Sequence, residues 1–168
     1  MYKHILVTLD GSEASEAALV EAQRLAEGLG VKVTLFRVAE VPASSGESPE
    51  PIRGAGQFAP GTVTKPREQR VFEDRGQAID RVKDEVQTYL SEKAAPLREG
   101  GIDVDTEVAL GDPVEEVLRM AGARGADLIV MATHGRTGLV QAIFGSVAAR
   151  VVGSGVRPVL LVRPARLR

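Results

Sequence analysis

Short apolar runs without alternation constrain the fold more than any other feature of this sequence. Ile5–Leu9, Leu128–Met131 and Val159–Val162 are largely apolar at successive positions. Such a run is typical of a parallel strand with both faces covered, whereas a half-exposed strand alternates. Val31–Val38 is rich in β-branched residues and predicts a further strand. Ile102–Val108 does alternate, so we expect this strand at an edge of the sheet.

Helical periodicity fills the stretches between these runs. Apolar residues recur there at intervals of three and four, which is the spacing of one helical face. Ser12 and Asp112-Pro113 are expected to begin two helices. Pro96 is expected to interrupt or kink another near its end, and Gly145-Ser146 opens a helix that runs to about Val152. The predicted buried stripes are Ala18, Ala22, Leu25 and Leu29; Ile79, Val82, Val86, Leu90 and Leu97; and Val114, Val117, Leu118 and Ala121.

Five strands separated by four such segments predict an α/β fold. The expected architecture is a single doubly wound, five-stranded parallel sheet with right-handed crossovers and helices on both faces. Placing the alternating strand at an edge gives the order 3-2-1-4-5, with the first and fourth strands adjacent at the centre. Ligands bind at the carboxyl ends of the strands at such a switch point.

The segment 41–76 breaks the strand–helix pattern. Its frequent prolines and glycines, from Pro42 to Gly61 and on to Pro66, disfavour a regular element. A structureless loop of this length is uncommon inside a compact domain. We interpret 41–76 as a surface insertion in a single domain that spans 1–168, because neither flanking part is self-sufficient.

Composition excludes several classes of function. Cys is absent, so disulfides, thiolate catalysis and Cys-based metal sites are excluded. The formal net charge of −2 provides no positive field for nucleic acid or an anionic membrane. The N-terminus does not look like a signal peptide, and no apolar stretch reaches the roughly 18 residues that span a bilayer. We therefore expect a cytoplasmic protein that binds neither nucleic acid nor a membrane.

Two loops at the predicted switch point carry the candidate chemistry. Asp10 follows the first strand and can accept hydrogen bonds from ribose hydroxyls. Gly135 and Gly138 follow the fourth strand and let the backbone approach a bulky anion. Gly145-Ser146 stands at a helix start, where free N–H groups and the helix dipole favour phosphate. Each feature has a structural alternative, since Asp10 can cap the first helix and the glycines can serve a tight turn.

Other catalytic motifs are missing from the sequence. There is neither a Walker-type G-x-x-x-x-G-K-[ST] loop nor a G-x-S-x-G elbow. The two histidines, His4 and His134, form no H-E-x-x-H motif, which disfavours a zinc site. We expect His4 to be structural or exposed, whereas His134 either bonds to loop backbone or contacts phosphate. A dedicated enzyme is therefore disfavoured, with slow ATP hydrolysis as the most that these residues allow.

The second loop resembles a motif of the ATP-binding universal stress proteins. Members of that family carry G-x-x-G, nine residues and G-[ST] after a buried strand. This chain has Ala132-x-x-Gly135, nine residues from Arg136 to Phe144, and then Gly145-Ser146. Ala132 thus replaces the first glycine of the pattern.

The resemblance extends over nearly the whole chain apart from 41–76. The opening strand that ends in Asp10-Gly11-Ser12 is similar to the start of the family. Gly111-Asp112-Pro113 is similar to its G-x-P turn before the third helix. Thr8 departs from the family, because proline is frequent at that position.

Carried over residue by residue, the resemblance implies an adenine nucleotide site. Asp10 would bind the ribose, and the backbone of Val38 would contact the adenine edge. The implied ligand is ATP, or ADP or AMP, and Mg²⁺ would accompany the phosphates. The resemblance also implies a homodimer through Val159–Val162, an edge strand whose backbone groups invite pairing. The full set of implied site residues is Thr8, Asp10, Val38, Met131, Ala132, His134, Gly135, Gly145, Ser146, Val147 and Ala148.

Three functions remain open at this point. The first is a stress-response regulatory module that binds ATP. The second is a universal stress protein that binds no nucleotide and acts through dimerisation and protein contacts. The third is a weak ATP hydrolase. The Gly135–Ser146 segment favours the first over the second, whereas Ala132 favours the second.

Overall fold

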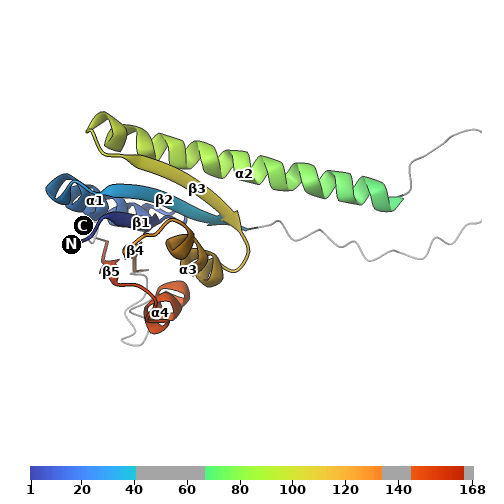
Figure 1. The fold of residues 1–168 in the computed structure, drawn as a ribbon. Helices are drawn as coiled ribbons and strands as arrows, with labels where there is room; N and C mark the ends of the chain where they lie inside the picture. The colour runs from blue at the N-terminus through green and yellow to red at the C-terminus, as the bar shows by residue number, and fades with distance from the viewer. Residues whose placement is uncertain (41–66, 134–144, 165–168) are drawn as a thin grey trace, which may run out of the picture.

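The computed structural model describes residues 1–40, 67–133 and 145–164, with side chains from residue 76 in the second range. Its strands form one parallel sheet of five strands in the order β3-β2-β1-β4-β5 (Figure 1), which confirms the predicted fold class and strand order. The strands are β1 (His4–Thr8), β2 (Lys32–Ala39), β3 (Val104–Leu110), β4 (Leu128–Ala132) and β5 (Val159–Val162). The helices are α1 (Glu13–Leu29), α2 (Arg67–Glu99), α3 (Pro113–Ala123) and α4 (Ser146–Gly153).

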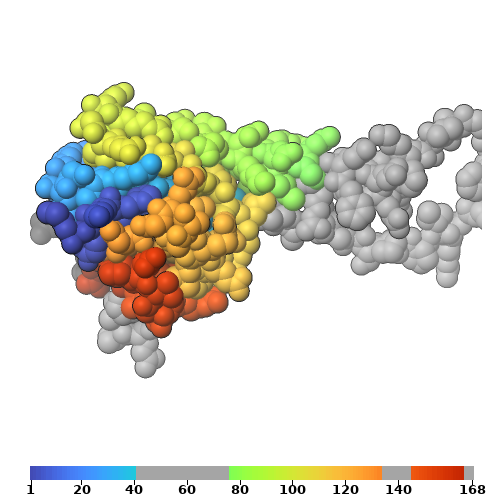
Figure 2. Space-filling model, viewed as in Figure 1, coloured from blue at the N-terminus to red at the C-terminus, as the bar shows by residue number. Residues whose placement is uncertain are grey.

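Two apolar layers hold the helices to the sheet. Alternate residues of β1 and β2 divide between them: Val7 and Leu35 pack toward α1 and α2, whereas Leu6 and Phe36 pack toward α3 and α4. All four of these side chains are fully buried. Figure 2 shows the same layers in space-filling form, with α2 and α4 on opposite sides of the sheet. The predicted coverage of both faces is therefore confirmed.

The buried stripe of α1 differs from the predicted one. Its buried residues are Ser15, Ala18, Ala22 and Ala26, whereas Leu29 is 38% exposed. The predicted stripe runs one turn too far, because the helix ends directly after Leu29. The C-cap is Gly30, which has φ 64° and donates its N–H to the Ala26 carbonyl. Ser12 is the N-cap, as predicted, and its hydroxyl accepts from the Ser15 N–H at 3.2 Å.

The predicted start of α2 is wrong, and so is the predicted interruption at Pro96. The helix begins at Arg67, so the irregular segment does not extend to residue 76. It also continues through Pro96 to Glu99. A proline in the last turn removes only its own N–H from the ladder. The end of the helix is meanwhile fixed by the burial of Leu97 and by the bond from the Ile102 N–H to the Leu97 carbonyl.

The length of α2 carries its N-terminal half beyond the sheet (Figure 1). Its 33 residues correspond to about 50 Å at the helical rise. Residues 41–66 lie outside the described residues, so the single domain over 1–168 with a surface insertion stays a prediction. Among the helices that the structure does describe, none is long and apolar enough to cross a membrane.

His4 has the structural role that was expected of it. The side chain is buried, and its Nε2 lies 2.8 Å from Thr34 Oγ1. Its Nδ1 lies 2.9 Å from the Arg124 carbonyl oxygen. This pair of bonds ties the amino end of β1 to β2 and to the end of α3.

Two leucine-to-alanine variants test the assignment of the core. Leu90 of α2 is fully buried and Leu29 of α1 is 38% exposed. Leu90→Ala should lower the free energy of unfolding by about 2 to 5 kcal/mol, since it leaves a cavity. Leu29→Ala should lower it by about 0.5 kcal/mol. Urea unfolding followed by circular dichroism measures both, and equal losses would contradict the assignment.

Candidate ligand-binding site

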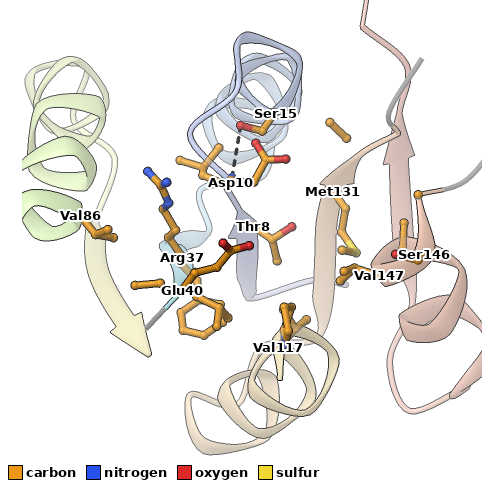
Figure 3. A pocket seen from close by; sticks show the side chains of 18 of the residues that line it. Thr8, Asp10, Ser15, Arg37, Glu40, Val86, Val117, Met131, Ser146 and Val147 are labelled. Carbon is orange, nitrogen blue, oxygen red and sulfur yellow. Dashed lines mark hydrogen bonds between the residues drawn. The ribbon is translucent and has the colours of Figure 1, made fainter. Parts of the chain in front are cut away.

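A cavity of about 560 Å³ opens at the carboxyl ends of the central strands (Figure 3). It is bounded by the loop after β1, the end of β2, the end of β4 and the start of α4, with walls from α2 and α3. β1 and β4 are adjacent in the sheet, and from them the chain proceeds outward in opposite directions. The cavity therefore lies at the predicted switch point.

Hydrogen bonds within the chain hold the loop after β1 in place. The Ser12 N–H donates to Asp10 Oδ1 at 2.8 Å, and the Asp10 N–H donates to the Ser15 hydroxyl at 3.4 Å. The Ser15 hydroxyl in turn donates to the Ser12 carbonyl at 2.7 Å. Gly11 has φ 84°, a backbone conformation that L side chains rarely adopt. Ser12 rather than Asp10 is the N-cap of α1, so the capping alternative for Asp10 is wrong.

The end of β2 contributes to both faces of the cavity. Arg37 belongs to the face of Leu35, beside α1 and α2, and Val38 packs with the residues of the α3 and α4 face. Both side chains are half-buried, whereas Glu40 is exposed at the mouth. In Figure 3 the Glu40 carboxylate is directed toward Thr8, and the Arg37 guanidinium lies between Val86 and Asp10.

The start of α4 presents free backbone donors to the cavity. Gly145 is the N-cap, and among the described residues no side chain caps the first turn. Gly145, Ser146, Val147 and Ala148 all line the cavity, beside Met131 and Ala132 at the end of β4. Unsatisfied N–H groups at a helix start attract anions, and the helix dipole adds to the effect. This side of the cavity is therefore suited to a negatively charged group.

The structure brings most of the predicted site residues together. His134 and Gly135 lie outside the described residues, and so do Arg136 and Gly138. Among the described residues, the predicted ones that line the cavity are Thr8, Asp10, Val38, Met131, Ala132, Gly145, Ser146, Val147 and Ala148.

Several lining residues were not found from the sequence. α2 contributes Val82, Glu85 and Val86, and α3 contributes Pro113 and Val117. Their spacing indicated a buried helical face but not which end of each helix would reach the site. Arg37 and Glu40 at the end of β2 were missed as well. Only their position directly beside Val38 could have drawn attention to them.

A charged cluster borders the cavity on the side of α2. The Tyr89 ring lies near two cations, with Arg37 Cζ 5.3 Å and Lys93 Nζ 5.6 Å from its centroid. Lys93 forms an ion pair with Glu16 at 2.6 Å. Burial raises the pKa of the Tyr89 hydroxyl, and the Glu16 carboxylate adds to this rise. The hydroxyl oxygen is buried close to Ser15 without forming a hydrogen bond.

The opposite wall depends on the N-cap of α3. Asp112 Oδ1 accepts from the Val114 N–H at 2.9 Å and from the Glu115 N–H at 3.1 Å. Arg150 of α4 lies 3.4 Å from the other carboxylate oxygen. The bonds from Glu115 and Val114 hold the pKa of Asp112 below its usual value, and Arg150 acts in the same direction. These contacts orient Pro113 at the cavity wall.

The arrangement combines donors, acceptors and apolar surface in one cavity. The start of α4 supplies donors for an anion, Asp10 supplies an acceptor for hydroxyl groups, and Val38, Val117 and Met131 supply apolar walls. Fold and site together define a doubly wound α/β protein with a ligand cavity at its switch point.

The chain belongs to the universal stress protein family. The sequence profile described as "Universal stress protein family" matches residues 1–163. The universal stress protein MJ0531 of Methanocaldococcus jannaschii is 30% identical over 163 residues, which cover 97% of this chain and 83% of that protein. These findings confirm the family resemblance of the sequence.

Solved structures share the fold. The protein MJ0577 of Methanocaldococcus jannaschii superposes with a TM-score of 0.73 at 26% identity, over 99% of each chain. A universal stress protein in complex with cAMP has a TM-score of 0.63 at 23% identity, over 98% of this chain and 99% of that one. A family member from Arabidopsis thaliana with AMP bound has a TM-score of 0.59 at 14% identity, over 98% of this chain and 93% of that one.

The cap of α3 predicts a defined dependence of stability on pH. The pKa of Asp112 in the folded protein is lowered from 3.8. The ionised carboxylate therefore adds to the free energy of unfolding above the unfolded pKa, and this contribution is lost as the pH falls through the folded pKa. Asp112→Ala should lower the melting temperature at pH 7, and the difference from wild type should shrink as the pH falls below 3.8 through the lowered folded pKa. Asp112→Asn keeps the acceptor without titrating, so it should remain close to wild type at pH 7. A difference between wild type and Asp112→Ala that is independent of pH would contradict the assignment.

Proposed function

We propose that this protein binds an adenine nucleotide, ATP foremost, and acts as a stress-response regulatory module. The observation that carries the proposal is the cavity at the ends of β1 and β4. Within it the Asp10 carboxylate and the free N–H groups of α4 are set on different sides. A nucleoside phosphate needs both features, since its ribose presents hydroxyl donors and its phosphates present anionic acceptors.

The charges that line the cavity favour one orientation of the nucleotide. Asp10, Glu40 and Glu85 are carboxylates on the side of β1, β2 and α2. A polyphosphate placed there would meet three carboxylates and a single cation, Arg37, whereas the start of α4 attracts it without opposing carboxylates. We therefore place the phosphates at Gly145-Ser146, the ribose at Asp10 and the base beside the backbone of Val38. His134 and Gly135, outside the described residues, remain proposed phosphate contacts on the sequence pattern alone.

The open cavity supports nucleotide binding over the alternative without a ligand. Ala132 replaces the first glycine of the family pattern, and its methyl group is the obvious obstacle to a nucleotide. Ala132 is a partly buried lining residue, and the cavity beside it keeps a volume of about 560 Å³. That volume lies within the usual range of small-molecule sites, about 300 to 1,000 Å³.

Two relatives with bound nucleotides lend further support. One universal stress protein was crystallised with cAMP and another with AMP. At 23% and 14% identity they share only the fold with this chain. What they contribute is that this fold accommodates an adenine nucleotide. The preference for ATP and the presence of Mg²⁺ on its phosphates are part of our proposal, and Mg²⁺ would need few protein ligands there.

Variants of Asp10 test the proposed ribose contact. Asp10→Ala should weaken ATP binding about 10- to 100-fold, since it removes a charged acceptor of the ribose hydroxyls. Asp10→Asn keeps an acceptor for the Ser12 N–H and should fall between Asp10→Ala and wild type. Isothermal titration calorimetry measures the affinities.

The matched control is Asp103→Ala at the opposite end of the sheet. The Asp103 carboxylate is exposed, and its ion pair with Lys32 is long, at 3.7 Å. Its removal should therefore leave the affinity for ATP unchanged. The proposal fails if wild-type protein binds no adenine nucleotide, or if Asp10→Ala binds ATP as tightly as wild type.

We also propose that two copies of the chain associate through β5. This strand is the last of the sheet and pairs only with β4, so one row of its backbone groups is unpaired within the sheet. Leu160 is 36% exposed there, and the nearby Val152 and Val156 are 45% and 53% exposed. An apolar edge strand of this kind is suited to pairing with its own copy.

Light scattering tests the dimer. Wild-type protein at micromolar concentration should have twice the monomer mass, and Leu160→Lys should shift it toward the monomer by placing two like charges at the pairing edge. Val20→Lys is the control, because Val20 is 50% exposed and belongs to α1 rather than to the pairing strand. A wild-type monomer would exclude the proposed dimer.

A further inference from the structure

Arg37 is an unexplained cation inside the cavity. It lies at the carboxyl end of β2, on the face of α1 and α2, and its side chain is half-buried. In Figure 3 its guanidinium lies between Val86 of α2 and Asp10 of the first loop. The proposed phosphate position at the start of α4 is on the other side of the cavity. The proposed placement of phosphates, ribose and base therefore gives Arg37 no contact with the nucleotide.

Two neighbours, Gly11 and Tyr89, lie close to the guanidinium. A Cβ on Gly11 would lie 2.5 Å from one terminal nitrogen and 2.8 Å from both Cζ and the other nitrogen. Gly11 therefore lies close against the end of the guanidinium that carries the two terminal nitrogens. Tyr89 supplies an aromatic contact, with its ring centroid 5.3 Å from Cζ. The guanidinium is thereby held in position without the use of its N–H groups.

The edge of the guanidinium is free for a ligand. Among the residues that the structure describes, no ion pair joins Arg37 to a carboxylate. Glu16, which acts on Tyr89, is paired with Lys93 at 2.6 Å. A planar guanidinium with free N–H groups binds a phosphate or carboxylate through paired hydrogen bonds. Partial burial of a cation that forms no ion pair costs free energy, and an anion supplied by a ligand offsets that cost.

We propose that Arg37 binds a second phosphate of the nucleotide, carried on the 2′ or 3′ oxygen of the ribose. This inference rests on the proposed function, which places the ribose at Asp10. Gly11, which supports the guanidinium, directly follows Asp10. In dinucleotide sites an Asp binds a free ribose hydroxyl, whereas an Arg accommodates a ribose phosphate. We assign the free hydroxyl to Asp10 and the phosphorylated oxygen to Arg37. The substrate class is an adenosine bisphosphate or a larger nucleotide that contains one.

The carboxylates around Arg37 do not compete for the same position. Asp10 Oδ1 already accepts from the Ser12 N–H at 2.8 Å. Glu40 is exposed and directed toward Thr8 in Figure 3, away from the guanidinium. Glu85 is exposed on α2, where water screens its charge. A phosphate at Arg37 therefore meets one half-buried cation, and the carboxylates around it are exposed to solvent that screens their charge.

The test compares three ligands by calorimetry: AMP, adenosine 3′,5′-bisphosphate and adenosine 2′,5′-bisphosphate. In wild-type protein one of the two bisphosphates should bind about tenfold more tightly than AMP, the gain of one charge-assisted contact. The ratio should fall to about one in Arg37→Met and should be partly kept in Arg37→Lys, which retains the charge without the planar fork. Arg24→Met, an exposed position on α1, should keep the wild-type ratio.

A second variant moves Arg37 without replacing it. Gly11→Ala would place a methyl group against the guanidinium, so the ratio of the affinities should fall in this variant as well. A folded Arg37→Met protein that keeps the wild-type ratio would overturn the proposal, whatever Gly11→Ala does.

The outcomes separate this inference from the proposed function. If AMP binds and neither bisphosphate binds more tightly, the second phosphate position is wrong and the nucleotide site stands. If none of the three ligands nor ATP binds, the proposed function fails, and this inference fails with it.

Discussion

The structure depends on β1 being buried from both sides. Ile5, Leu6 and Val7 are fully buried, and β1 pairs with β2 on one edge and β4 on the other. Because the crossovers leave β1 and β4 toward opposite edges of the sheet, a crevice forms at the carboxyl ends of these two strands. The position of the cavity is thus a consequence of the topology. Its chemistry comes from the residues that follow the central strands and line its rim.

The rim divides into two parts with different chemistry. The loop after β1 is fixed by its own hydrogen bonds among Asp10, Ser12 and Ser15, so the Asp10 carboxylate is held in place before any ligand arrives. The start of α4 offers backbone donors with no side-chain cap. Arg37 adds a guanidinium on the side of α2, supported by Gly11 and Tyr89. A preorganised site of this kind loses little free energy to ordering on binding.

Local sequence signals predicted well wherever one element decides the outcome. The strand order followed from unbroken apolar runs and one alternating strand, and the caps Ser12 and Asp112 followed from residue type alone. The errors arose where packing between elements decides. Leu29 fits the helical spacing but lies past the point at which α1 faces the sheet. Pro96 is tolerated because it stands in the last turn, with Leu97 buried beside it.

The sequence by itself determined the order of the strands, the family and the loops that surround the cavity, because these depend on periodicity and on motifs close together in the chain. Only the tertiary structure decided which residues of α2 and α3 form the walls, since that depends on where each helix crosses the sheet. It also decided the environment of Arg37. A single arginine at the end of a strand has no signature in sequence, and its position between Gly11 and Tyr89 brings together three separate elements.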